Sequence, residues 1–168
     1  MRKIIDPSEL DLKQENVVSI KRISKATTGG RSVSFNAVVA IGDGNGHIGI
    51  GLGKAKEVVS AVNKAKEIAK KNIFKVPIIN KTIPHMLKYK YNSCRLVLKP
   101  AGPGTGIIAG ASVRSVLEQV GVSDILVKNL GSTNPINVVK AIEYGLKQLK
   151  DPYMVARQRG IKMKELFT

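Results

Sequence analysis

The chain has 168 residues, a length that allows one domain of ordinary size or two small ones. Its 28 lysines and arginines against 12 acidic residues give a net charge of +16, which is unusual for a free globular enzyme and indicates a polyanionic partner, most commonly a nucleic acid. A single cysteine, Cys94, excludes an internal disulfide, and the lack of a long apolar run or a signal-peptide core predicts a cytoplasmic protein without a membrane partner.

The positive charge is unevenly distributed along the chain. Residues 16–99 hold 16 basic and three acidic residues, so this stretch alone carries +13. Residues 1–15 are nearly neutral, and we expect them to form a flexible leader that does not contact phosphate. Tryptophan is absent and only seven residues are Phe or Tyr, so few rings are free to stack on bases. This composition favours a folded RNA that is recognised through its shape and backbone.

Residues 16–79 predict an N-terminal unit of three strands and a helix. Two segments rich in β-branched residues, 17–25 and 33–41, flank TTGGR and predict a hairpin that turns at Gly29-Gly30. The next strand, HIGIGLG, has glycine at alternate positions, which indicates the close approach of another backbone. Apolar residues then recur with helical spacing and predict one buried stripe: Val58, Ala61, Val62, Ala65, Ile68 and Ala69.

Residues 80–150 predict a second unit with the order β-α-β-α. The strand CRLVLKP is followed by the loop AGPGTG and by a helix that Gly121 ends. The strand ILVKN follows, and Asn134-Pro135 supplies the cap and first residue of a helix that runs to Leu149. Residues 151–168 form a basic tail. The pattern predicts an α+β protein with two small domains.

The glycine-rich loops do not fit a nucleotide-binding motif. Gly53-Lys54 lacks the first glycine and the Ser/Thr of a P-loop, and GNGHIG at 44–49 joins two strands and does not open a helix. GTGIIA at 104–109 does precede a helix, but Asp124 stands before the next strand, where a ribose-binding acid would not be. A nucleotide-dependent enzyme built on this last loop remains the alternative from the enzyme class, and a DNA-compacting protein is a third.

Residues for other chemistry are scarce. His47, His85 and Cys94 are too few to furnish a four-ligand zinc site, and a Cys94–His85 pair would lack an orienting third group. We therefore expect no catalytic residue, metal, cofactor or small-molecule substrate.

Two segments suit RNA. The loop Lys25–Arg31 combines glycines, hydroxyls and cations at a hairpin tip, and GSTNP at 131–135 offers free N–H groups and hydroxyls at the start of a helix. The predicted RNA-binding residues are Lys21, Arg22, Lys25, Thr27, Thr28, Gly29, Gly30, Arg31, Lys54, Lys56, Lys64, Ser132, Thr133 and Asn134.

Four motifs in these segments resemble the small-subunit ribosomal protein five family: VSIKRISKATTGGRSVSF, GDGNGHIGIGLGKAKEV, PAGPGTGIIAGASVRSVLE and GSTNPINVVKA. The resemblance runs from about Val17 to Leu149. It implies a β-β-β-α unit akin to a double-stranded RNA-binding domain without its first helix, followed by a β-α-β-α unit with a left-handed crossover.

The same resemblance implies binding to small-subunit ribosomal RNA, a role in subunit assembly, contacts with ribosomal proteins four and eight, and an influence on decoding accuracy. The family's hairpin loop, here Lys25–Arg31, would lie near the spectinomycin site and the head–body junction. Thr28 stands where many relatives carry Lys, so the resemblance does not carry that lysine's phosphate contact or the spectinomycin response over to this chain. The interface with protein four maps onto Gly104, Thr105, Gly106 and Arg114.

Overall fold

The computed structural model describes residues 14–162 and residue 165, which fold as the predicted α+β protein with two sheets. The first unit contains β1 (Gln14–Thr27), β2 (Gly30–Gly42), β3 (His47–Ala55), α1 (Val58–Lys71) and β4 (Ile73–Lys75). Its strands form an antiparallel sheet in the order β1-β2-β3-β4. Residues 1–13 of the expected leader lie outside the described residues. Glu15 belongs to β1 and not to a leader, and it forms an ion pair with Lys66 of α1.

The β1–β2 hairpin turns one residue earlier than the sequence predicted. Thr27 pairs with Gly30, so the two turn residues are Thr28 and Gly29. Gly30 opens β2 with φ +133°, a conformation that side-chain-bearing residues rarely adopt, which explains why glycine is needed there. The Thr27 hydroxyl donates to the Gly30 carbonyl at 2.9 Å and closes the turn.

The glycines of β3 allow α1 to lie against the backbone of the sheet, as their spacing predicted. A Cβ atom on Gly51 would lie 2.6 Å from Ala69 N and closer still to Ala65 O. Gly49 and Gly53 meet the same helix in the same way. The predicted stripe is buried most deeply at its alanines, which have no exposed surface: Ala61, Ala65 and Ala69. Small residues on both elements therefore fix the short distance between helix and sheet.

The second unit contains β5 (Leu87–Tyr91), β6 (Cys94–Pro100), β7 (Ile107–Ile108), α2 (Ala111–Val120), β8 (Ile125–Asn129) and α3 (Pro135–Gln148). The sheet order is β5-β6-β8-β7. The two strands expected from the sequence, β6 and β8, run antiparallel, and β8 is parallel only to the short β7. The parallel connection is thus β7-α2-β8, and its left-handed crossover stays a prediction.

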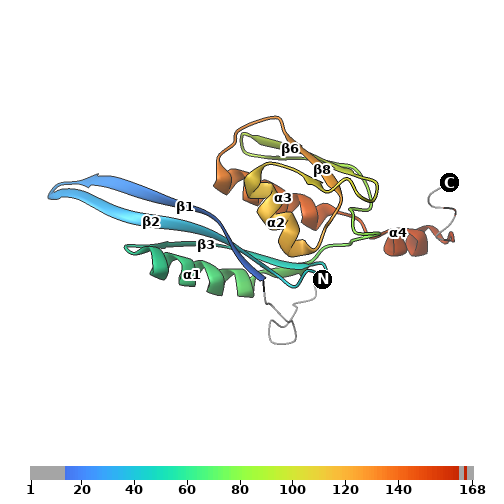
Figure 1. Ribbon diagram of the computed structural model, residues 1–168, viewed down its shortest axis with the longest axis horizontal. Coiled ribbons are helices and arrows are strands. Elements are labelled where there is room, and N and C mark those ends of the chain that lie inside the picture. Colours follow the sequence, from blue (N-terminus) through green and yellow to red (C-terminus); the bar gives the residue numbers. More distant parts are fainter. Residues whose placement is uncertain (1–13, 163–164, 166–168) are drawn as a thin grey trace.

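The two units share a hydrophobic core. α1 covers one face of the first sheet, through Ala37, Val39 and Ile41. The opposite face contributes to a buried cluster that also contains α2 and α3 residues, through Val38, Ala40, Ile48 and Ile50. Figure 1 accordingly shows four layers, with α1 lowest, then the first sheet, then α2 and α3, then the second sheet. This shared core fixes the first sheet relative to α3.

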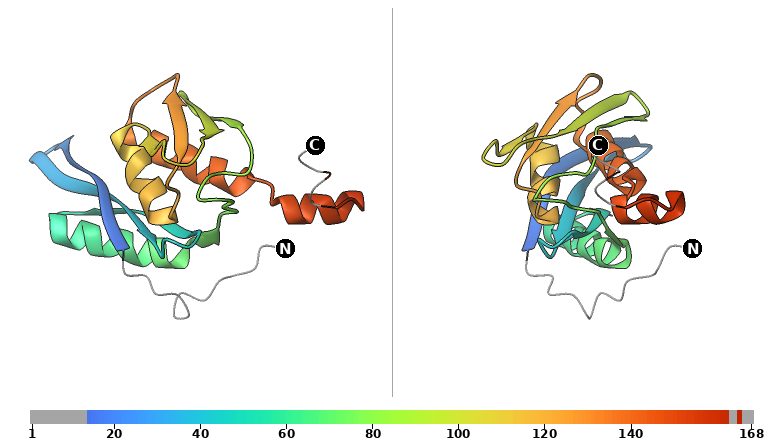
Figure 2. Two further views of the ribbon diagram at one scale, coloured as in Figure 1. Left: turned by 45° about the vertical axis from the view of Figure 1, so that its right-hand side comes forward. Right: turned by 90° about the vertical axis from the view of Figure 1, so that its right-hand side faces the viewer.

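The expected basic tail begins with a further helix, α4 (Pro152–Arg159), which the sequence did not predict. The Asp151 carboxylate accepts a hydrogen bond from Tyr153 N–H at 3.0 Å and caps this helix. Figure 2 shows α4 extending from the body. Lys164 of the tail lies outside the described residues. None of the helices described is long and apolar enough to cross a membrane.

Candidate nucleic-acid interface

The β1–β2 hairpin projects beyond the body of the molecule at the end opposite α4 (Figure 1). Its outer part, residues 21–32, is exposed except for the half-buried Ile23. No acidic residue lies between Glu15 and Asp43, whereas four cations do: Lys21, Arg22, Lys25 and Arg31. None of these four takes part in an ion pair within the described residues. The hairpin thus carries a positive charge that the described residues do not neutralise.

Strand register places two of the predicted cations in one row across the sheet. Lys21 pairs with Asn36 on β2, and Asn36 pairs with Lys54 on β3. Lys25 pairs with Ser32 and lies on the same face as this row, because it is four residues along the same strand from Lys21. This is the face that α3 covers closer to the body. We call Lys21, Lys25 and Lys54 together the cationic row.

The other hairpin cations lie on the opposite face. Arg22 pairs with Phe35, which packs against α1, and Arg31 is an even number of residues from Phe35 on β2. Lys64 is exposed in the middle of α1, on the α1 side of the sheet, and Lys56 is exposed in the turn between β3 and α1. The predicted RNA-binding residues of the first unit therefore occupy two faces and do not form a single cluster.

The start of α3 lies next to the cationic row. Ile136, in the first turn of α3, lines a cavity together with Val38 and Leu52, which form the row adjacent to Asn36 and Lys54. Figure 1 shows that α3 begins at the end of the molecule toward which the hairpin projects. The structure thus brings the first turn of α3 to the row beside Asn36 and Lys54.

Asn134 is the N-cap residue of α3 and Pro135 is its first residue, as the sequence predicted, but the Asn134 side chain does not cap the helix. The Asn134 side chain makes no capping hydrogen bond, and the Ser132 hydroxyl instead accepts from Asn134 N–H at 3.3 Å. Thr133 is exposed and its side chain lines a separate pocket. With no side-chain cap, N–H groups of the first turn of α3 keep the capacity to bind an anion.

Asn36 is a residue of this surface that the sequence did not single out. Its side-chain oxygen is buried and has no hydrogen-bond partner in the described structure. The only signal was a polar amide within an apolar strand. Its position between Lys21 and Lys54 depends on strand register, which sequence patterns do not specify at single-residue precision.

The β2–β3 turn ties the two units together. Gly44 N–H and Gly46 N–H donate to the last carbonyls of α2, Gln119 O at 3.2 Å and Val120 O at 2.9 Å. A Cβ atom on Gly121 would overlap the Gly44 backbone, so a side chain at Gly121 would separate the units.

Asp43 organises this turn from within. Its carboxylate accepts from Asn45 N–H at 2.7 Å and from His47 N–H at 3.0 Å, and lies 2.6 Å from His47 Nδ1. Burial alone would raise the pKa of Asp43, but the hydrogen bonds from Asn45 and His47 and the charge of the His47 ring outweigh it, so this pKa lies below its ordinary value. The Asp43 carboxylate therefore has a structural role in this turn.

The loop predicted to contact protein four is held in a fixed conformation. Gly104 and Gly106 adopt φ +88° and +74°, and the Thr105 hydroxyl donates to Gly102 O at 2.8 Å. The buried Asp124 carboxylate accepts from Gly106 N–H at 2.9 Å. This role of Asp124 was missed, because the partner is a backbone group 18 residues away.

Arg114, the remaining residue of the predicted protein interface, lies on the exposed surface of α2. Its Nε lies 3.0 Å from Glu118 Oε1, which is the helical pairing expected from their spacing. The side chains are 59% and 43% exposed, so this ion pair adds little stability. Among the described residues, no hydrogen bond joins Arg114 to the loop 104–106.

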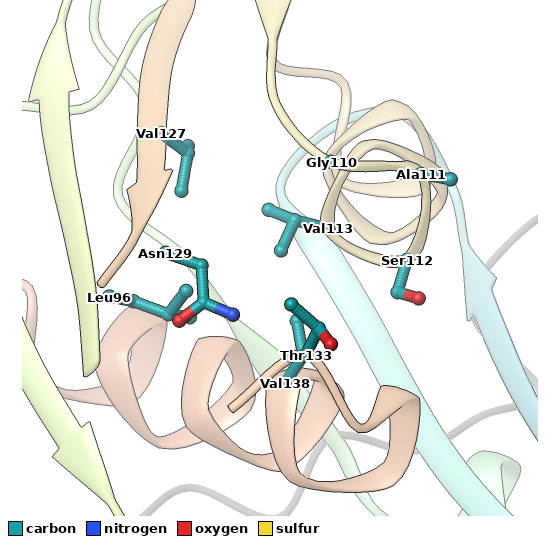
Figure 3. A pocket seen from close by; sticks show the side chains of 9 residues that line it. All are labelled: Leu96, Gly110, Ala111, Ser112, Val113, Val127, Asn129, Thr133 and Val138. Atoms are coloured by element: carbon teal, nitrogen blue, oxygen red, sulfur yellow. The ribbon is translucent and has the colours of Figure 1, made fainter. Parts of the chain in front are cut away.

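The structure does not support a nucleotide site at GTGIIA. Residues 107–108 form β7, so the glycines do not open a helix directly, and Asp124 is already engaged by Gly106. A pocket of about 190 Å³ does lie between the starts of α2 and α3 (Figure 3). Its lining includes Leu96, Val113 and Val138 but no charged side chain, so it offers no cation to nucleotide phosphates.

The residues considered for metal or covalent chemistry have structural partners instead. Cys94 is buried, which raises the pKa of its thiol, and its Sγ lies 3.6 Å from Asn129 Oδ1. His85 Nε2 accepts from Lys150 N–H at 3.1 Å, and its Nδ1 lies 3.0 Å from Met86 O. Within the described part of the chain, His, Cys, Asp and Glu form no group of three or more that could hold a metal ion.

Comparison with known proteins agrees with the two-unit fold. Residues 13–77 match the family model described as ribosomal protein S5, N-terminal domain, and residues 89–159 match ribosomal protein S5, C-terminal domain. The small ribosomal subunit protein uS5 of Flavobacterium psychrophilum is 50% identical over 165 residues, which cover 98% of this chain and 94% of that protein. Its counterpart in Thermotoga maritima is 49% identical over 154 residues, covering 92% and 86%. The chain therefore belongs to the ribosomal protein S5 family.

Proposed function

We propose that this chain is a structural constituent of the small ribosomal subunit that binds small-subunit ribosomal RNA through the β1–β2 hairpin and the start of α3. The S5 family is a family of ribosomal proteins and not of enzymes, and the curated relatives carry the name small ribosomal subunit protein. The protein accordingly works in the cytoplasm as part of the ribosome, with ribosomal RNA and other ribosomal proteins as its partners.

The observation that carries this proposal is the cationic row on the outer part of the projecting hairpin, where residues 21–32 include no acid. Lys21, Lys25 and Lys54 lie on one face, next to the uncapped start of α3. Lysine ammonium groups and free N–H groups both bind phosphate without reading base sequence. Arg22 and Arg31 extend the positive charge to the opposite face, so the hairpin can lie between two stretches of RNA backbone.

Finer roles rest on the same surfaces. We infer that the hairpin lies at the head–body junction, where it supports assembly and influences translational accuracy, and that Gly104–Gly106 with Arg114 contacts ribosomal protein four, with protein eight as a second neighbour. The anchoring of Gly106 by Asp124 supports this interface, because a fixed loop loses little conformational entropy on binding. Ile108, 56% exposed and directly beyond the loop, supplies an apolar contact beside it.

The test measures the salt dependence of binding to a small-subunit ribosomal RNA transcript. We expect Lys21→Ala/Lys25→Ala and Arg22→Ala/Arg31→Ala each to lower the slope of log K against log salt by up to about two. The matched control, Lys70→Ala/Lys71→Ala, removes the same charge from the exposed end of α1 and should leave the slope near that of wild type.

Circular dichroism first establishes that all three variants are folded. Wild-type slopes for both hairpin variants would refute the hairpin as the RNA-binding element. Equal affinity for duplex DNA and for the ribosomal transcript at matched salt would favour a DNA-compacting protein instead.

A further inference from the structure

One face of the second sheet is covered by none of the helices that the structure describes. α2 and α3 pack on the face that carries Leu96 and Leu98, and the residues that alternate with these point away from the body. Figure 1 shows this outer sheet face along the top of the molecule, on the far side of α2 and α3 from the hairpin sheet. Its exposed cations are Lys88, Lys90, Arg95, Lys99 and Lys128.

Strand register places these cations in closely spaced rows across neighbouring strands. Lys88 and Lys128 flank Val97 in one row across three strands, and Lys90 pairs directly with Arg95 in the next row. Adjacent strands lie about 5 Å apart and alternate residues about 7 Å apart, so the five charges occupy an area of roughly 10 by 14 Å. Fewer charges would be enough to keep an exposed strand face polar, so solubility alone does not explain this density of positive charge.

The described part of the chain supplies no anion to this face. No acidic residue lies between Glu67 and Glu118, and none of the five cations takes part in an ion pair in the described structure. Like charges directly opposite each other on neighbouring strands, such as Lys90 and Arg95, destabilise a sheet. The arrangement is therefore unfavourable in the isolated chain and becomes favourable when a polyanion lies across it.

We propose that the outer sheet face binds the backbone of a folded RNA segment, separately from the hairpin. Four of its five cations are lysines, which are depleted in protein–protein interfaces. Tyr89 and Tyr91 of β5 point inward, where the Tyr91 ring stacks on Tyr144 of α3 at 5.4 Å, so no aromatic ring of these strands is free for unpaired bases. Cations without rings suit duplex RNA contacted through its phosphates.

This second surface makes the chain a bridge between two RNA segments. The hairpin belongs to the first unit and the outer sheet face to the second, with α2 and α3 between the two sheets. The inference does not depend on the hairpin as an RNA-binding element, since it uses none of the same residues.

The experiment compares two triple variants of the full chain on a small-subunit ribosomal RNA transcript. Lys88→Gln/Lys90→Gln/Lys128→Gln removes three charges from the outer sheet face, and we expect the salt slope to fall by about two to three. The control, Lys70→Gln/Lys71→Gln/Lys150→Gln, removes three exposed lysines elsewhere and should keep the slope within about half a unit of wild type. Thermal melting should show the sheet variant to be at least as stable as wild type, because a like-charge pair is relieved.

Combination with Lys21→Ala/Lys25→Ala separates the two surfaces. Additive decreases in slope support two independent phosphate-binding sites. A decrease in slope for the hairpin variant alone overturns the outer-face proposal and leaves the proposed function intact. A decrease in slope for the sheet variant alone supports the outer-face proposal and overturns the hairpin as the RNA-binding element. A sheet variant that keeps the wild-type slope but fails to enter reconstituted small subunits would assign this face to a protein partner and would also overturn the proposal.

Discussion

Gly51→Ala tests the backbone contact that holds α1 against the hairpin sheet. The added Cβ would lie 2.6 Å from Ala69 N and nearer to Ala65 O, whereas ordinary contacts begin at about 3.5 Å. The helix must therefore retreat by at least roughly 1 Å, which opens a gap along three alanines that are fully buried. Neither neighbour is a flexible side chain, so we expect a loss near the upper end of the overpacking range, about 3 kcal/mol.

Urea denaturation followed by circular dichroism measures this loss. Gly29→Ala is the matched control, because a Cβ there meets nothing within 4 Å and the residue is not in the left-handed region. Both substitutions reduce the entropy of the unfolded chain equally, so their difference isolates the steric cost. At a slope of about 2 kcal/mol per molar urea, the midpoint of Gly51→Ala should fall by about 1.5 M. A difference below about 1 kcal/mol between the two variants would refute the proposed close packing.

Three further outcomes follow from single contacts. The pKa of Asp43 is depressed in the folded protein, so its contribution to stability is present above the unfolded pKa of about 4 and is lost as pH falls through the folded value. Thermal melts should therefore show Asp43→Asn to be less stable than wild type at pH 7 and nearly equal to it at the acid end. A difference in melting temperature that persists at the acid end would contradict this. Asp124→Ala leaves Gly106 N–H without its acceptor and should cost about 1–2 kcal/mol and speed amide exchange at Gly106, whereas unchanged exchange would argue against the anchor. Cys94 should react with a thiol reagent in urea but not within minutes in native buffer at pH 8, since its thiol is buried and its pKa raised; rapid native labelling would show the site to be open.

Long periodic segments were predictable from sequence because their signals are local. The glycine alternation in β3 and the alanine stripe of α1 each describe one side of the same contact, and both predictions were confirmed. The apolar spacing of α2 and its termination at Gly121, which adopts φ +88°, were also confirmed. Each of these features depends on residues that are close together in the sequence.

Features that depend on tertiary pairing were missed. The two-residue strand β7 is too short to show a pattern, and only its pairing with β8 defines it. The turn at Thr28-Gly29 differs by one residue from the prediction because the register is set by the whole ladder. Lys21 and Arg22 lie on opposite faces because successive strand residues alternate, which divides the predicted RNA-binding set, and the register shows which face each of them takes. Asp124 binds a backbone group of a distant loop, for which no sequence pattern exists.

Ultraviolet cross-linking within intact small subunits, read by mass spectrometry of the cross-linked peptides, tests the central claim most directly. If the projecting hairpin lies against ribosomal RNA, peptides that contain residues 21–32 will carry cross-linked nucleotides. Full recovery of these peptides without nucleotide, while other segments of the chain are cross-linked, would contradict the assignment of the hairpin as the RNA-binding element.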